Sequence, residues 1–123
     1  MTESELTLRR KIMVAFAKTG APPPAEELDR DVLDALAEHH VVVLDNEGEI
    51  RMAHPFAAHD EGATVTAISG TWRGNCAWDA YGIVAALGLR DARISANGLS
   101  TGPGVRFHVE VPAARWWDDV GYT

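Results

Sequence analysis

The first forty residues place apolar side chains at the three- and four-residue spacings of amphipathic helices. The first repeat predicts a helix over residues 4–18, which Gly20 and the prolines at 22–24 bring to an end. A second repeat predicts a helix over 25–39, with a break near Asp29 as an alternative and with acidic residues in its first turn. The apolar positions of the two repeats are Leu6, Leu8, Ile12, Met13, Phe16 and Ala17, and then Leu28, Val32, Leu33, Leu36 and Ala37.

Beyond residue 40 the pattern changes to short apolar runs and alternating residues, which are typical of strands. Residues 41–44 and 49–52 predict a hairpin whose turn contains Gly48. An irregular stretch at 53–56 then precedes a strand at 63–68 and a turn at Ser69 and Gly70. Further strands are predicted at 92–95 and 105–111, joined by a turn over 97–104.

Between these strands, residues 75–88 have the pattern of a capped helix. Asn75 is a good N-cap and Gly88 a good C-terminal stop, so Cys76 is predicted to be the first helical residue. The elements together predict an α+β protein, in which an N-terminal helical, winged-helix-like lobe packs on a small mixed or antiparallel sheet that carries one active-site helix. We place the lobes at 1–53 and 54–123 and expect them to form one compact unit.

The composition is that of an ordinary globular protein, with 46% hydrophobic residues in 123. No stretch approaches the roughly 20 apolar residues that cross a bilayer, and the first residues are acidic where a secretory signal would be basic. We therefore expect a cytoplasmic protein with no membrane partner. Cys76 is the one cysteine of the sequence, so no internal disulfide is expected and its thiol is available for chemistry.

Cys76 and Asp79 are the strongest candidates for a reactive pair. At the start of a helix, unpaired N–H groups and the helix dipole stabilise a thiolate. Asp79 follows three residues later, so its carboxyl can reach an atom that the sulfur holds. The alternative is that Cys76 is a buried small residue and Asp79 an ordinary first-turn acid.

The segment Asn75-Cys76-Ala77-Trp78-Asp79-Ala80, with Gly82-Ile83 and Ala85-Ala86-Leu87, resembles the active-site helix of the organomercurial (alkylmercury) lyases. The segments 52–56 and 116–119 also resemble that family, so the similarity covers about 50–123. The resemblance implies that Cys76 is the first of two thiolates that bind R–Hg⁺, and that Asp79 protonates the carbon as the C–Hg bond breaks. Mercury would then be part of the substrate or product, and no cofactor is expected.

The family pattern places a second metal-binding cysteine after the Trp-Trp-Asp-Asp segment, and this sequence has no second Cys. Added thiol or a second subunit of a homodimer would have to supply the other soft ligand. A non-catalytic module that binds a soft metal or a small hydrophobic ligand through one thiolate is therefore the main alternative, and a winged-helix DNA-binding regulator is a further one.

Five other residues are candidates for a pocket around the thiol: His54, Trp72, Arg73, Trp78 and Trp116. The tryptophans could form walls for an organic group or belong to the core, and Arg73 could hold an anionic group or pair with Asp118 or Asp119. His54 and His59 could complete a metal site with Cys76, but they lack ligand-spaced partners, so zinc is not predicted.

The charge distribution argues against nucleic acid as a partner. The formal net charge is −7, and residues 1–60 carry 6 basic and 12 acidic side chains. In a winged helix, the helix that enters the DNA groove would here be acidic, with Arg30 as its one basic residue. The acidic residues are Glu26, Glu27, Asp29, Asp31, Asp34 and Glu38.

We predict that the protein does not bind DNA appreciably at physiological salt, because an acidic helix would be repelled by phosphates. Titration of a labelled duplex at low and at moderate salt tests this. Micromolar affinity with a steep dependence on salt would contradict it.

Overall fold

The computed structural model describes residues 1–96 and 105–108, and within these it is an α+β protein. Its helical elements are α1 (Glu3–Thr19), the 3₁₀ turn η1 (Ala25–Glu27), α2 (Arg30–Glu38) and α3 (Ala77–Leu87). Its strands are β1 (Val43–Leu44), β2 (Ile50–Ala53), β3 (Phe56–Ala57), β4 (Ala63–Ala67), β5 (Gly70–Gly74), β6 (Asp91–Ala96) and β7 (Val105–His108).

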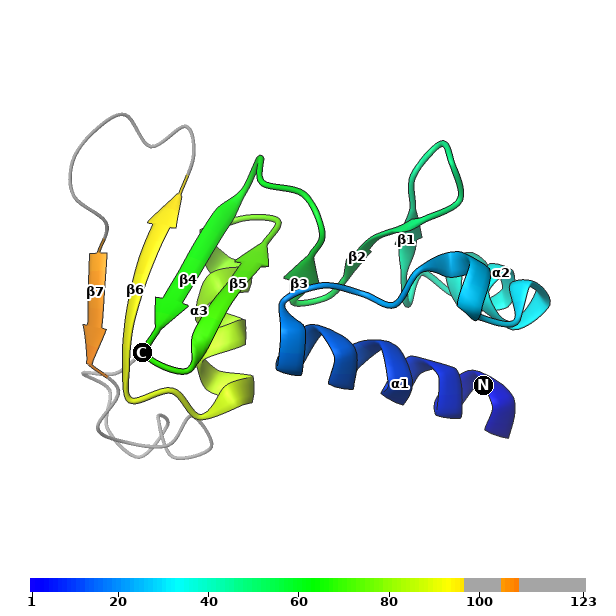
Figure 1. Ribbon diagram of the computed structural model, residues 1–123, viewed down its shortest axis with the longest axis horizontal. Helices are drawn as coiled ribbons and strands as arrows, with labels where there is room; N and C mark the ends of the chain where they lie inside the picture. Colours follow the sequence, from blue (N-terminus) through cyan, green and yellow to red (C-terminus); the bar gives the residue numbers. More distant parts are fainter. Residues whose placement is uncertain (97–104, 109–123) are drawn as a thin grey trace.

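The strands form two small sheets in which every pairing is antiparallel. The first sheet has the order β1-β2-β3 and the second the order β5-β4-β6-β7. Figure 1 shows α1, α2 and the first sheet at one end of the molecule, and the second sheet with α3 on one of its faces at the other end. The predicted alternative of a mixed sheet is therefore not observed among the described strands.

The helices of the first half follow the sequence pattern closely. Thr2 and Glu5 form a capping box at the start of α1, each side chain meeting the backbone N–H of the other residue. The second predicted helix is divided into η1 and α2, which confirms the predicted alternative of a break near Asp29. The break occurs because the Asp29 side chain accepts the N–H of Val32 and caps a new helix there.

Two short strands were not predicted. β5 lies where the sequence predicts a turn and the segment that leads into a helix. The sequence does not predict this strand, because glycines at both of its ends weaken the strand pattern. β3 has two residues, in the stretch read as irregular. Of the other sequence predictions, the 105–111 strand is observed over Val105–His108. Its last part, 109–111, and the 97–104 turn lie outside the described residues.

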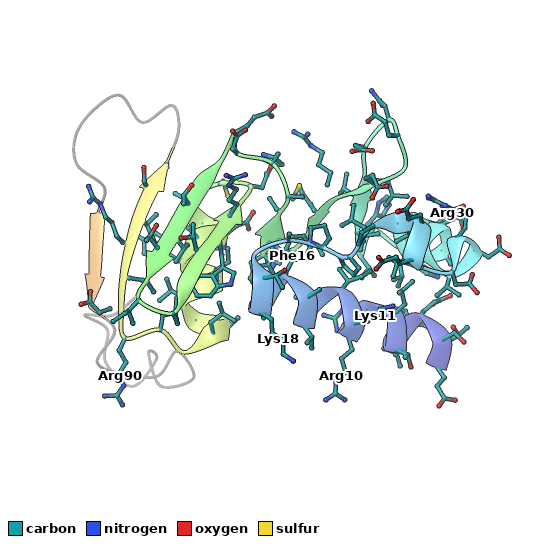
Figure 2. All side chains as sticks on the ribbon, viewed as in Figure 1. Arg10, Lys11, Phe16, Lys18, Arg30 and Arg90 are labelled. Carbon is teal, nitrogen blue, oxygen red and sulfur yellow. The ribbon has the colours of Figure 1, made fainter. Side chains whose placement is uncertain are left out.

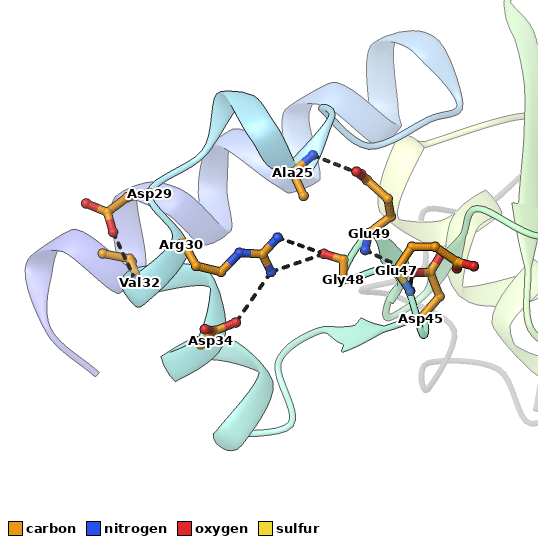
Figure 3. Close-up of polar contacts among 9 residues, drawn as sticks. All are labelled: Ala25, Asp29, Arg30, Val32, Asp34, Asp45, Glu47, Gly48 and Glu49. Carbon is orange, nitrogen blue, oxygen red and sulfur yellow. Dashed lines mark hydrogen bonds and ion pairs between the residues drawn. The ribbon is translucent and has the colours of Figure 1, made fainter.

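A network of polar contacts ties α2 and η1 to the β1–β2 turn (Figure 3). The Arg30 guanidinium donates to the Gly48 carbonyl at 3.2 and 3.3 Å. The Asp45 carboxylate accepts the N–H groups of Glu47 and Glu49 at 2.9 Å, and the Glu49 carboxylate accepts the Ala25 N–H at 2.9 Å. These bonds satisfy turn and helix-start donors that would otherwise face only water.

The two halves of the molecule share one buried apolar cluster, and the end of α1 is where they meet. Phe16, on the part of α1 nearest β3 (Figure 2), stacks on Phe56 with ring centroids 5.3 Å apart. The Trp72 indole N–H on β5 donates to the Ala17 carbonyl at 2.9 Å. Ala17 is in the last turn of α1, where carbonyls lack a helical partner, so Trp72 both fills the junction and satisfies the helix end.

Over the part of the chain that the structure describes, no helix has the length and apolar character needed to span a membrane.

We predict that Trp72→Phe lowers the free energy of unfolding by about 1–3 kcal/mol, because the Ala17 carbonyl loses its donor at a buried contact. Trp78→Phe is the matched control, since Trp78 is 80% exposed and its replacement should change stability by less than about 0.5 kcal/mol. Urea unfolding of both variants gives the comparison, and equal stabilities would show that the indole contact does not hold the junction.

Candidate functional site

The candidate site lies at the start of α3, and its first residue differs from the prediction. Cys76, not Asn75, is the N-cap: its backbone is extended, with φ −151° and ψ 175°, and the helix begins at Ala77. The Cys76 carbonyl accepts the Ala80 N–H at 3.1 Å, which is the first helical hydrogen bond. Its side chain makes no capping bond and the residue is exposed, so the sulfur is open to reagents. The reading of Cys76 as a buried small residue is therefore wrong.

Asp79 lies in the first turn of the same helix and is buried. Its side chain is 9% exposed, and it shares the inward face of α3 with Ala80, Ile83 and Val84. A negative charge in the first turn is favoured by the helix dipole, but removal of a carboxylate from water is costly without a partner. Asp79 shares this burial with Glu5, the third residue of α1, whereas the first-turn acid Asp31 of α2 is exposed.

The burial of Asp79 depends on a close approach of β5 to α3. A Cβ built on Gly74, the last residue of β5, would lie 3.0 Å from the Asp79 Cβ and 3.1 Å from the Ala80 nitrogen. A side chain there would push the strand away from the first turn of the helix. Glycine at 74 therefore lets the strand pack closely against the first turn of the helix.

On the other side, the turn between β2 and β3 brings a histidine to the carboxyl. The Nδ1 atom of His54 lies 3.0 Å from Asp79 Oδ1, and the His54 side chain is 70% exposed. Pro55, the next residue, packs on α3 at Gly82, where an added Cβ would be 3.3 Å from the Pro55 Cβ. The small residue at 82 lets the turn rest on the helix, and this contact sets the position of His54.

The N-cap and third helical positions place Cys76 and Asp79 in the same turn. The two side chains differ in surroundings, since the thiol is exposed and the carboxyl is buried against the rest of the fold.

The predicted pocket residues are placed differently from one another. Trp72 is 5% exposed and belongs to the core at the α1 junction. Arg73, its neighbour on β5, is exposed, and Trp78 is exposed beside Asp79 on α3. His54 is in contact with Asp79, as described above. Trp116, together with the predicted Asp118 and Asp119 partners of Arg73, lies outside the described residues.

His59 lies near the start of α3 but does not form a metal site with Cys76 and His54. Its Nδ1 accepts the Glu61 N–H at 3.2 Å, so its Nε2 carries the proton and donates to the Asn75 side-chain oxygen at 3.2 Å. Within the described ranges, no three His, Cys, Asp or Glu side chains are grouped to hold a metal ion.

A groove of about 400 Å³ lies elsewhere in the molecule, between α1 and the start of α2. Its walls include Leu8, Lys11, Asp29 and Val32, none of which belongs to α3 or to the turn that carries His54. The candidate chemistry is thus at an open helix start rather than in this groove.

The residue whose role the sequence did not reveal is His54. It was a candidate for a pocket or a metal site, whereas its contact in the structure is with the Asp79 carboxyl, 25 positions away. One local signal was available: His54 precedes Pro55 at the end of an apolar run, a position where turns form. No pattern in the sequence says which helix such a turn contacts.

Comparisons of the chain with protein-family models, with curated proteins and with solved structures give no match. The resemblance to organomercurial lyases therefore rests on the residues of the α3 segment and its neighbours and stays a prediction, and the function must be argued from the site.

Proposed function

We propose that the protein is an organomercurial-lyase-like enzyme that uses Cys76 to capture an organometallic or related small electrophilic substrate and Asp79 to protonate the carbon that leaves. The observation that carries the proposal is the contrast between the two side chains. The thiol is exposed at the N-cap of α3, and the carboxyl in the same turn is buried.

Capture at Cys76 follows from the chemistry of sulfur. A thiolate is a soft ligand and binds soft metals such as Hg²⁺ far better than hydroxyl or carboxylate oxygens do. Because the Cys76 side chain makes no capping bond, its sulfur is not held by the protein's own backbone.

Proton delivery is assigned to Asp79 because its carboxyl is in the first turn of the helix that Cys76 caps. When the C–Hg bond breaks, its electron pair stays on carbon, and a proton from the carboxylic acid forms the new C–H bond. A carboxylic acid within hydrogen-bond reach of the reacting carbon can act as the general acid for this step. The products are the hydrocarbon, the metal on sulfur and the Asp79 carboxylate.

The single cysteine of the sequence favours one alternative. With one thiolate the protein could hold a soft metal or a small hydrophobic ligand without cleaving a bond, as a binding module. In the enzymatic reading, an added thiol or a second subunit supplies the other soft ligand for the released metal.

For the N-terminal lobe we propose a winged-helix-like arrangement with a scaffolding role. The order α1, η1, α2 and then the β1–β2 hairpin is consistent with such a lobe. Its contacts to β5 through Trp72 and to β3 through Phe16 support a role in holding the site in place. Acidic residues on η1 and α2 favour this role over DNA binding.

We predict that two substitutions separate capture from cleavage. Cys76→Ser should abolish both capture of an organomercurial and release of its hydrocarbon, because a hydroxyl is a hard, weakly acidic ligand. Asp79→Asn should keep capture and lower the rate of hydrocarbon release by about 10²–10⁴-fold, because the amide has the same shape but no acidic proton. Mercury binding measured by mass spectrometry and hydrocarbon measured by gas chromatography, with excess thiol present, give the two readouts.

Asp31→Asn is the matched control, because Asp31 is also a first-turn acid but lies on α2, away from the thiol. It should leave both readouts at wild-type values. Wild-type protein that captures the organomercurial and releases no hydrocarbon would leave the binding module as the function. Cleavage by Asp79→Asn at the wild-type rate would show that Asp79 is not the proton donor.

A further inference from the structure

The His54–Asp79 pair joins the buried carboxyl to solvent. Asp79 is 9% exposed, whereas His54, whose Nδ1 lies 3.0 Å from the carboxyl oxygen, is 70% exposed. The two side chains come from different elements, the β2–β3 turn and α3, and the packing of Pro55 against Gly82 holds those elements together. Among the described contacts, His54 is the titratable side chain that lies against the Asp79 carboxyl, and it faces water.

A buried proton donor that acts repeatedly needs a way to regain its proton. Each C–Hg bond that is cleaved leaves Asp79 as a carboxylate, and its burial limits direct exchange with water. An imidazole can bind a proton from solvent on one ring nitrogen and release one from the other. The ring of His54 is placed to do both.

We infer that His54 is the residue through which Asp79 is reprotonated between turnovers; this rests on the proposed lyase-like function. A solvent acid protonates Nε2 of His54, and the Nδ1 proton moves to Asp79 Oδ1. Asp79 becomes a carboxylic acid and His54 a neutral imidazole. After Asp79 has given its proton to carbon, the exposed ring exchanges with water and returns to the Nδ1-protonated form, so one solvent proton is consumed for each C–Hg bond broken.

His54 acts on the substrate only through Asp79, so it is a positioning residue rather than a catalytic one. Two replacements separate proton supply from simple support. Asn at position 54 can keep an N–H donor near the place of Nδ1 but cannot carry a proton from solvent. Ala at position 54 leaves a space at the surface that a small imidazole from solution can enter.

A second histidine–carboxylate pair provides a matched control. His39 Nε2 lies 3.9 Å from Glu5 Oε2, with the His39 side chain 56% and the Glu5 side chain 10% exposed. This pair has the same chemical groups and a similar contrast in exposure, but it joins the end of α2 to the start of α1, far from Cys76 in the fold.

The test measures organomercurial capture and the steady-state rate of hydrocarbon release, with excess thiol, for wild type, His54→Asn, His54→Ala and His39→Asn. We expect unchanged capture in all four proteins. Hydrocarbon release should fall by about 10²-fold in both His54 variants, in the range of a lost proton-transfer group, and stay at the wild-type rate in His39→Asn. Added imidazole should restore His54→Ala in proportion to its concentration and should not restore Asp79→Asn.

Each failure has its own signature. Release by His54→Asn at the wild-type rate, or a loss in His54→Ala that imidazole does not restore, would overturn the proton-supply role while the lyase-like function stands. Absence of hydrocarbon release by wild-type protein itself would overturn the proposed function, and the role of His54 with it.

Discussion

The burial of one carboxyl group is the constraint around which the second half of the molecule is arranged. An acid removed from water needs charge balance or a polar partner, and Asp79 has both the N-terminal end of the α3 dipole and the His54 ring at 3.0 Å. Gly74 and Gly82 both lie where an added Cβ would be in tight contact, at 3.0 Å from the Asp79 Cβ and at 3.3 Å from the Pro55 Cβ. The site is therefore formed by close packing on both sides of one helix turn, with the thiol left outside it.

The N-terminal half contributes to this arrangement through its contacts rather than through its charges. Phe16 stacks on Phe56 in β3, two residues after His54, and Trp72 in β5 bonds to the last turn of α1, two residues before Gly74. The strands that position His54 and Gly74 are thus both anchored on α1. Basic side chains of α1, such as Arg10 and Lys18, point outward from the helix (Figure 2). A scaffolding role for this half is consistent with a helix that contacts the strands through Phe16 and Ala17 and keeps its basic side chains on the outside.

The sequence was sufficient for features that depend on local patterns. The spacing of Leu8, Ile12 and Phe16 predicted α1, and Asp29 marked the break before α2, because periodic burial and capping act over one or two turns. Gly88 ends α3 in the left-handed conformation as predicted. The error of one residue at its start arose because Asn75 is the better capping side chain, whereas the observed cap uses only the backbone of Cys76.

Features that depend on packing between distant segments could not be predicted. β5 was missed because its central Trp72 is stabilised by α1 rather than by a strong strand pattern of its own. The burial of Asp79 and its contact with His54 required knowledge of which face of α3 the sheet covers and where the β2–β3 turn rests. Residue types at the site could be listed from the sequence, but their division into an exposed nucleophile, a buried acid and a surface histidine came from the fold.

In the proposed reaction, a group captured by Cys76 presents its carbon to residue 79. A crystal structure of Asp79→Asn with an organomercurial bound tests this most directly, because the variant should retain the uncleaved adduct. We expect mercury on the Cys76 sulfur, with its carbon within about 3–3.5 Å of the residue 79 amide, the separation of reacting groups in a productive complex. An adduct whose organic group points away from residue 79 into solvent would contradict it.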